Sequence, residues 1–151
     1  MISGQRLLLS ICPRCARGST NHLSHLAAAL VRKAGGNACI DVFTFHVYAG
    51  DVATVARLVG TLKAVHPAGK QVHVTEFGWN VQEVGEARQA ANLAATIVAL
   101  AGTSWINVAM PYEMVDDPWV STYRMGLWRG DLSPRPAVEA MRVAIAAVRR
   151  K

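Results

Sequence analysis

The residues with the clearest chemical potential lie where predicted strands end. Glu76 closes a β-like run in the stretch VTEFGWN, and the carboxyl end of a parallel strand is where α/β proteins keep their catalytic groups. His46 and Tyr48 follow the neighbouring predicted strand. They could hydrogen-bond Glu76, which would orient it and keep it ionised. The alternatives are a solvated glutamate at a strand end and a core histidine with satisfied hydrogen bonds.

A second carboxylate would be needed for paired acid and base chemistry. Glu113 follows Tyr112 at the end of the last predicted strand. Because adjacent parallel strands lie about 4.8 Å apart, Glu76 and Glu113 could approach each other if both point inward. Asp116 and Asp117 in the next loop could swing in as another source, but we favour the alternative that this Asp-Asp-Pro sequence forms a turn.

The segment CPRCARGSTNHLSH brings together residues that bind metals, and it holds Cys12, Cys15, His22 and His25. Two cysteines two residues apart and two histidines one helical turn apart could ligate zinc, but the gap between the pairs is shorter than in a classical finger. We therefore favour free thiols and solvent-facing histidines, and expect no metal. No GxGxxG or Walker sequence is present, so we expect no nucleotide cofactor.

Four strand–helix units position these residues. Hydrophobic periodicity predicts strands over 6–11, 40–47, 71–76 and 105–110, and helices over 23–34, 54–65, 87–101 and 136–149. The strands recur about every 30–35 residues, the length of a βα unit with its loop. Such alternation predicts an α/β fold with a parallel sheet and right-handed crossovers.

A length of 151 residues predicts a single domain, residues 1–151. This domain is too short for an eight-stranded barrel, which needs about 200–250 residues. Polar side chains after three of the strands favour a half barrel, (β/α)4, over an open sheet with helices on both faces. A half barrel has two open edges and an exposed inner face, which we expect to be apolar. Two copies related by a twofold axis could close into eight strands, so we expect a homodimer. Glu76 would then face the Glu76 of the second copy. Two carboxylates at close range raise the pKa of one of them, because both cannot easily be charged together.

Composition limits the partners. Hydrophobic residues make up 52% and charged residues 17%, which argues against disorder. The net charge of +6 comes from scattered basic residues, densest at residues 149–151, so we expect no nucleic-acid partner. The sequence contains no run of about 18 apolar residues, so we expect no membrane span. The apolar stretch near the start is too short for a signal sequence. Three cysteines do not indicate a secreted disulfide framework, so we expect a cytoplasmic location.

The motifs DVFTFHVY, VHVTEFGWN, PYEMVDDP and MGLWRGDLSPRPAVEAM occur in this order. The order resembles the carboxyl-terminal half of clan A glycoside hydrolases, most closely the β-xylosidase and iduronidase group. The resemblance covers about residues 40–141 and implies strands five to eight of a TIM barrel, with residues 6–34 as strand five and its helix. It implies retaining hydrolysis of β-linked sugars, of β-glucoside or β-xyloside type, with Glu76 as the nucleophile.

The sequence departs from this family in one respect, because the family's acid/base follows an asparagine at the end of strand four and no Asn-Glu pair occurs here. Glu113, the following loop or a second copy would have to replace it. A carbohydrate substrate would contact His46, Tyr48, Trp79, Tyr112 and Trp128, for which ordinary packing is the alternative. Besides an enzyme, the chain could be an inactive barrel half that at most binds carbohydrate. A weaker alternative is a zinc-stabilised module with a basic surface.

Overall fold

The computed structural model describes residues 8–11, 30, 33–35, 38, 40–64, 69–119 and 122–150. Its elements, in chain order, are β1 (Leu8–Ile11), β2 (Val42–Val47), α2 (Val52–Leu62), β3 (Gln71–Phe77), α3 (Val81–Val84), α4 (Glu86–Ala101), β4 (Val108–Pro111) and α5 (Pro136–Val148). The expected helix over 23–34 falls mostly outside the described residues.

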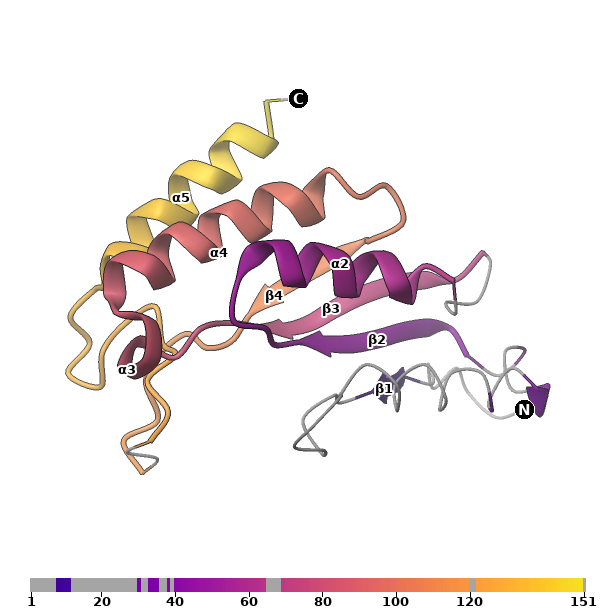
Figure 1. Cartoon of the computed structure of the whole chain (residues 1–151), viewed down its shortest axis with the longest axis horizontal. Coiled ribbons are helices and arrows are strands. Elements are labelled where there is room, and N and C mark those ends of the chain that lie inside the picture. Colours follow the sequence, from indigo (N-terminus) through magenta and orange to yellow (C-terminus); the bar gives the residue numbers. More distant parts are fainter. Residues whose placement is uncertain are drawn as a thin grey trace, which may run out of the picture.

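The described strands form one parallel sheet in the order β1-β2-β3-β4, so each strand pairs with its neighbour in the chain. All the strands point toward the same end, and α2, α4 and α5 lie on one face of the sheet (Figure 1). A doubly wound sheet would reverse its strand order and carry helices on both faces. The arrangement of the described elements confirms the α/β half barrel.

The helix-facing side of the sheet forms the hydrophobic core. Phe43, Phe45, Val72 and Val74 have no exposed surface, and they pack with the buried stripe of α2 and with Leu93 of α4. Alternation along a strand turns the intervening residues to the other side.

In β2 and β3 that other side carries Thr44, His46, His73 and Thr75, together with Val42 at the start of β2. The inner face of these two strands is therefore mostly polar, against the expectation of an apolar face, because apart from Val42 most of their apolar residues occupy the positions that face the helices.

Two predicted boundaries moved for local reasons. Helix α2 begins two residues early because Asp51 caps it, with Asp51 Oδ1 accepting a 2.7 Å hydrogen bond from the Thr54 backbone N–H. Strand β4 begins at Val108, not at Trp105, because a turn intervenes in which the Ile106 N–H donates to the Thr103 carbonyl.

A buried ion pair anchors the long segment between β4 and α5. Arg135 donates two hydrogen bonds to Asp116, of 3.0 Å and 2.7 Å, and both side chains are at most 5% exposed. Glu86, at the start of α4, accepts from Arg135 at 3.1 Å and from Arg129 at 2.6 Å and 3.0 Å. These contacts tie the loop after β4 to the beginnings of α4 and α5.

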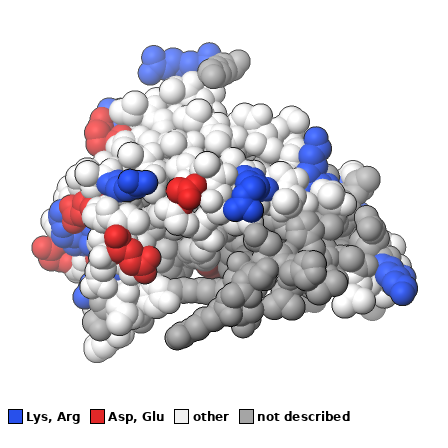
Figure 2. All heavy atoms as spheres, viewed as in Figure 1, with Lys and Arg blue, Asp and Glu red and all other residues white. Residues whose placement is uncertain are grey.

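Charged side chains of both signs are interspersed on the face shown in Figure 2, where no continuous basic patch lies on the described residues. Within the described ranges, no helix has both the length and the apolar character needed to cross a membrane.

Candidate active site

Glu76 lies at the carboxyl end of β3, beside the end of β2. A register shift between Phe45 and His46 aligns His46 with Glu76. The Tyr48 hydroxyl donates a 2.7 Å hydrogen bond to Glu76 Oε2, and His46 Nδ1 lies 3.3 Å from the same oxygen. The structure thus brings together the three residues that the sequence singled out on these two strands.

The Glu76 carboxylate is both oriented and accessible. A short hydrogen bond from a hydroxyl to one carboxylate oxygen fixes the plane of the group. The Glu76 side chain remains 32% exposed, whereas His46 is 15% exposed. A carboxylate held in this way at the mouth of a half barrel can attack an electrophile or accept a proton.

Glu113 follows β4 and differs from Glu76 in its surroundings. Its backbone is held by Leu127, whose N–H donates to the Glu113 carbonyl at 2.9 Å, and the Tyr112–Glu113 peptide bond is cis. Burial raises the pKa of Glu113, a hydrogen bond with the Tyr112 side chain lowers it, and the charge of Asp116 raises it. Glu113 Oε1 is buried without a hydrogen-bond partner among the described residues. Such surroundings disfavour the charged form of a carboxyl group relative to a solvent-exposed one.

Tyr112 connects the two carboxylates electrostatically. Burial raises the pKa of Tyr112, and the charges of Glu113 and, more weakly, Glu76 raise it further. The Tyr112 ring packs edge-on against Tyr48, with ring centroids 6.4 Å apart and an interplanar angle of 79°.

Gly78 explains the glycine of EFGW, because a Cβ at this position would collide with the Tyr112 carbonyl oxygen. Only a residue without a side chain lets the chain leaving β3 approach the end of β4 this closely.

The aspartates after β4 have structural roles. Of the two alternatives for Asp116, the structure disfavours a carboxylate that swings into the site, since the buried pair with Arg135 holds both of its oxygens. Asp117 Oδ1 accepts a 2.8 Å hydrogen bond from the Trp119 N–H, as in the expected turn.

The two tryptophans predicted to bind sugar lie at different places. Trp79 is 3% exposed and packs in the core, and it also lines the pocket described next. Trp128 is partly buried against the core and is not among the residues lining that pocket.

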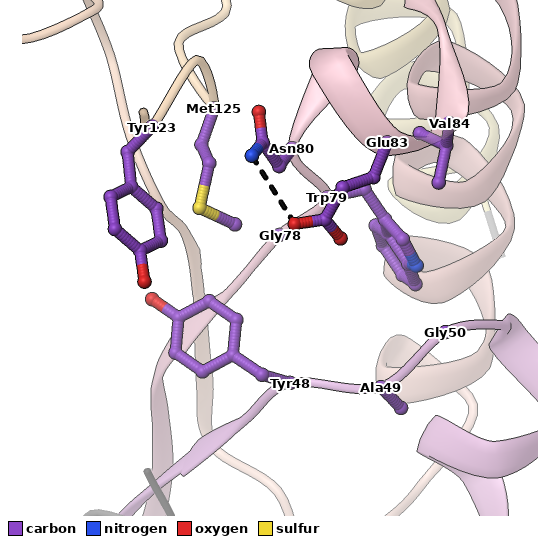
Figure 3. A pocket seen from close by; sticks show the side chains of 10 residues that line it. All are labelled: Tyr48, Ala49, Gly50, Gly78, Trp79, Asn80, Glu83, Val84, Tyr123 and Met125. Carbon is purple, nitrogen blue, oxygen red and sulfur yellow. Dashed lines mark hydrogen bonds between the residues drawn. The ribbon is translucent and has the colours of Figure 1, made fainter. Parts of the chain in front are cut away.

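A cavity of about 190 Å³ lies next to the Glu76 site (Figure 3). It is lined by Tyr48, Ala49, Gly50, Gly78, Trp79, Asn80, Glu83, Val84, Tyr123 and Met125. Sequence reasoning missed Asn80, Glu83 and Tyr123. An available signal was the Asn-x-x-Glu spacing of Asn80 and Glu83, which is typical of a helix start. Asn80 does cap α3, and its Oδ1 accepts from the Gln82 N–H at 3.2 Å.

The residues of the zinc alternative, Cys12, Cys15, His22 and His25, lie outside the described residues. Among the residues that are described, no three histidine, cysteine or acidic side chains gather as a metal site would require.

The family model described as "Glycosyl hydrolase catalytic core" matches residues 10–128. Similar solved structures include a family 39 glycoside hydrolase from Bacteroides cellulosilyticus WH2, 26% identical, which the chain matches over 77% of its own length and 29% of the enzyme's, with a TM-score of 0.63. Xylanase 10B from Thermotoga maritima is 13% identical. The match covers 89% of this chain and 45% of the xylanase, with a TM-score of 0.63. The Bifidobacterium dentium β-glucuronidase is 19% identical. The match covers 71% of this chain and 21% of the β-glucuronidase, with a TM-score of 0.59.

No curated protein sequence matches the chain. The chain spans less than half the length of the three solved structures described above. Those under 25% identical show the shared fold alone.

Proposed function

Because the chain belongs to the glycosyl hydrolase catalytic core family, we propose that it hydrolyses β-linked sugars, of β-glucoside or β-xyloside type, with Glu76 as the nucleophile. The observation that carries this proposal is the Glu76 carboxylate, oriented by Tyr48 at 2.7 Å and adjacent to His46. The matched family 39 glycoside hydrolase, 26% identical, supports a sugar substrate by its name.

In the first step, a Glu76 oxygen attacks the anomeric carbon and the bond from that carbon to the leaving oxygen breaks. The leaving oxygen takes a proton from an acid on the other side of the bond. Water then attacks the glycosyl ester, gives its proton to the same group and releases Glu76. The product keeps the anomeric configuration of the substrate.

Glu113 is the proposed acid and base within one chain. Burial raises the pKa of Glu113, which suits a group that must hold a proton until the leaving oxygen needs it. The charges of both Glu113 and Glu76 raise the pKa of Tyr112, which supports their placement around one hydroxyl. A retaining pair must stand about 5–5.5 Å apart.

A second copy of the chain is the alternative source of the acid. In the described sheet, β1 and β4 each pair on one side only, and unpaired edges favour association. Met110 in β4 and Met114 just after it are 45% and 63% exposed, which supports burial of this edge in a homodimer. Sedimentation at micromolar concentration tests this proposal, and a stable monomer would contradict it.

Hydrolysis of aryl β-xylosides and β-glucosides tests the nucleophile. An activated aryl leaving group needs little acid assistance, so an incomplete site should still register. We expect the wild type to be active and Glu76→Gln to lose at least about 10³-fold in kcat/KM. Glu139→Gln is the matched control, because Glu139 is exposed on α5 and paired with Arg142. Equal activity of Glu76→Gln and the wild type would refute the assignment.

The absence of an Asn-Glu pair supports a second candidate function, a barrel half that binds carbohydrate without catalysis. This function predicts that the wild type and Glu76→Gln are both inactive, while a disaccharide still binds.

A further inference from the structure

We infer that Gln89 is a positioning residue, which holds the backbone of the proposed acid, Glu113, at a fixed place relative to Glu76. The inference rests on the proposed function and deepens it, since it names what sets the geometry of the candidate catalytic pair. Gln89 lies near the start of α4 and has no exposed surface. It therefore cannot contact a substrate, and any effect that it has on the reaction must pass through other residues.

The side-chain amide of Gln89 joins two segments of the chain. Its Nε2 donates one hydrogen bond to the Trp79 carbonyl at 3.2 Å and another to the Met125 carbonyl at 3.1 Å. Trp79 lies two residues after β3, whereas Met125 lies in the long segment between β4 and α5 (Figure 3). Because both acceptors are carbonyls, only the amide nitrogen can face them, which fixes the orientation of the amide group.

One of these two acceptors also holds Glu113. The Glu113 N–H donates to the same Met125 carbonyl at 3.4 Å, so this oxygen accepts hydrogen bonds from both Gln89 and Glu113. The other acceptor, Trp79, is three residues after Glu76. Gln89 therefore connects the two strand ends that carry the candidate carboxylates.

The position of Glu113 depends on this connection more than the position of Glu76 does. The Glu76 carboxylate is held from β2, by the Tyr48 hydroxyl at 2.7 Å. Glu113 hydrogen-bonds instead to neighbours in its own segment, the Tyr112 side chain and the Asp117 backbone. These neighbours move with Glu113, so the place of the whole stretch depends on its backbone contacts with other segments. Loss of the Gln89 amide should therefore displace Glu113 more than Glu76.

The other end of the amide indicates that Gln89 is not there for packing. Gln89 Oε1 is buried without a hydrogen-bond partner among the described residues, and a buried polar atom in this state costs free energy. For packing alone, an apolar side chain of the same shape would serve at least as well. What a glutamine supplies at this place, and an apolar residue does not, is the pair of hydrogen bonds to the two segments.

A separate set of hydrogen bonds fixes the outer part of the same contact. Asn80 Oδ1 accepts from the Arg124 N–H at 3.2 Å, and the Val81 N–H donates to the Arg124 carbonyl at 2.9 Å. Removal of the Gln89 amide should therefore loosen the contact near Glu113 without separating the two segments. A small displacement is enough to matter, because a shift of about 1 Å at a reacting group can lower a rate about 10²-fold.

Hydrolysis of a series of aryl β-xylosides by Gln89→Met tests this role. Methionine is unbranched like glutamine but donates no hydrogen bond. Because less acidic phenols need more help from the acid, kcat/KM should fall at least about tenfold for the phenyl xyloside and less than about threefold for the dinitrophenyl xyloside. With the phenyl substrate, the decline of kcat/KM above the raised pKa of Glu113 should be smaller in Gln89→Met, because less of the rate then depends on that proton.

Thr96→Val is the matched control on the same helix. Thr96 also has no exposed surface, and its Oγ1 has no hydrogen-bond partner among the described residues, so this change should leave the rates unaltered. For Gln89→Met, a loss of the same size with every aryl leaving group, or no loss at all, would overturn the inference.

Hydrogen exchange followed by NMR gives a readout that needs no activity. In Gln89→Met the Glu113 amide proton should exchange at least about tenfold faster, beyond any change at Phe45 of β2, whose buried amide reports global unfolding. Equal acceleration at both residues would indicate general destabilisation and would overturn the inference. In the wild type, the side-chain amide protons of Gln89 should exchange at least about 100-fold more slowly than those of the exposed Gln71. Fast exchange there would overturn the inference even if Gln89→Met does not fold.

The two readouts separate this inference from the proposed function. An inactive wild type, in which Gln89→Met still accelerates exchange at Glu113, would leave the positioning role intact and refute the proposed catalysis. An active wild type, with exchange at Glu113 that Gln89→Met does not change, would support the catalysis and refute the positioning role.

Discussion

The replacement Asp116→Ala tests whether the aspartate after β4 is structural. Asp116 is 3% exposed, accepts 2.7 Å and 3.0 Å hydrogen bonds from Arg135 and a 2.9 Å bond from the Gly126 N–H. Breaking a buried pair by removing one partner costs about 3–5 kcal/mol, because the other charge stays buried. The Gly126 N–H also loses its acceptor, which overlaps with this cost. We therefore expect the free energy of unfolding to fall by about 3–5 kcal/mol.

Equilibrium unfolding in urea, followed by circular dichroism, measures this loss. Asp117→Ala is the matched control, since Asp117 Oδ1 accepts an exposed hydrogen bond from the Trp119 N–H. This replacement should cost about 1 kcal/mol or less. A loss below about 1 kcal/mol for Asp116→Ala, or equal losses for the two variants, would refute the argument that the buried pair anchors this segment.

Three further outcomes are expected. Gly78→Ala should destabilise the fold by about 1–3 kcal/mol in urea, because its Cβ would meet the Tyr112 carbonyl; unchanged stability would contradict the close approach. A hydrogen bond from Arg129 lowers the pKa of Glu86, against the opposing effect of burial. The Glu86 carboxylate therefore stabilises the fold at pH values above its ordinary pKa of 4.5, and this contribution is lost as the pH falls through the lowered pKa. Glu86→Gln should flatten the pH dependence of unfolding in that acidic window, and an unchanged slope would count against the pairing. Burial raises the pKa of Glu113, so hydrolysis of an unactivated glycoside should decline as the pH rises through this raised pKa, where Glu113 loses its proton. A pH profile that Glu113→Gln leaves unaltered would exclude Glu113 as the acid.

The fold was largely readable from the sequence because each strand and helix carries its own period. The expected strand over 71–76 became Gln71–Phe77, and the helix over 136–149 became Pro136–Val148. The start of the fourth strand was predicted at Trp105 instead of Val108, because Trp105 and Ile106 are apolar yet lie in a turn after α4. Local hydrophobicity does not distinguish a strand from a turn that packs against the core.

The candidate site was partly readable. Glu76, His46 and Tyr48 could be grouped because parallel strands end at the same edge of a sheet. The cavity was not foreseen, because it depends on the contact between the end of β3 and residues 122–125. That contact is made by Gln89 and Asn80 over 36 and 42 residues of sequence, and no local pattern encodes it.

The most direct measurement for the central claim is covalent trapping of the nucleophile. A retaining enzyme forms a glycosyl ester on its nucleophilic carboxylate, and an aryl 2-deoxy-2-fluoro-β-xyloside or β-glucoside slows release of that ester. Mass spectrometry of the treated protein should find one added sugar, mapped by peptide fragmentation to Glu76 and absent from Glu76→Gln. A protein that hydrolyses aryl glycosides while carrying the label on another residue, or one that neither hydrolyses nor becomes labelled, would contradict the account.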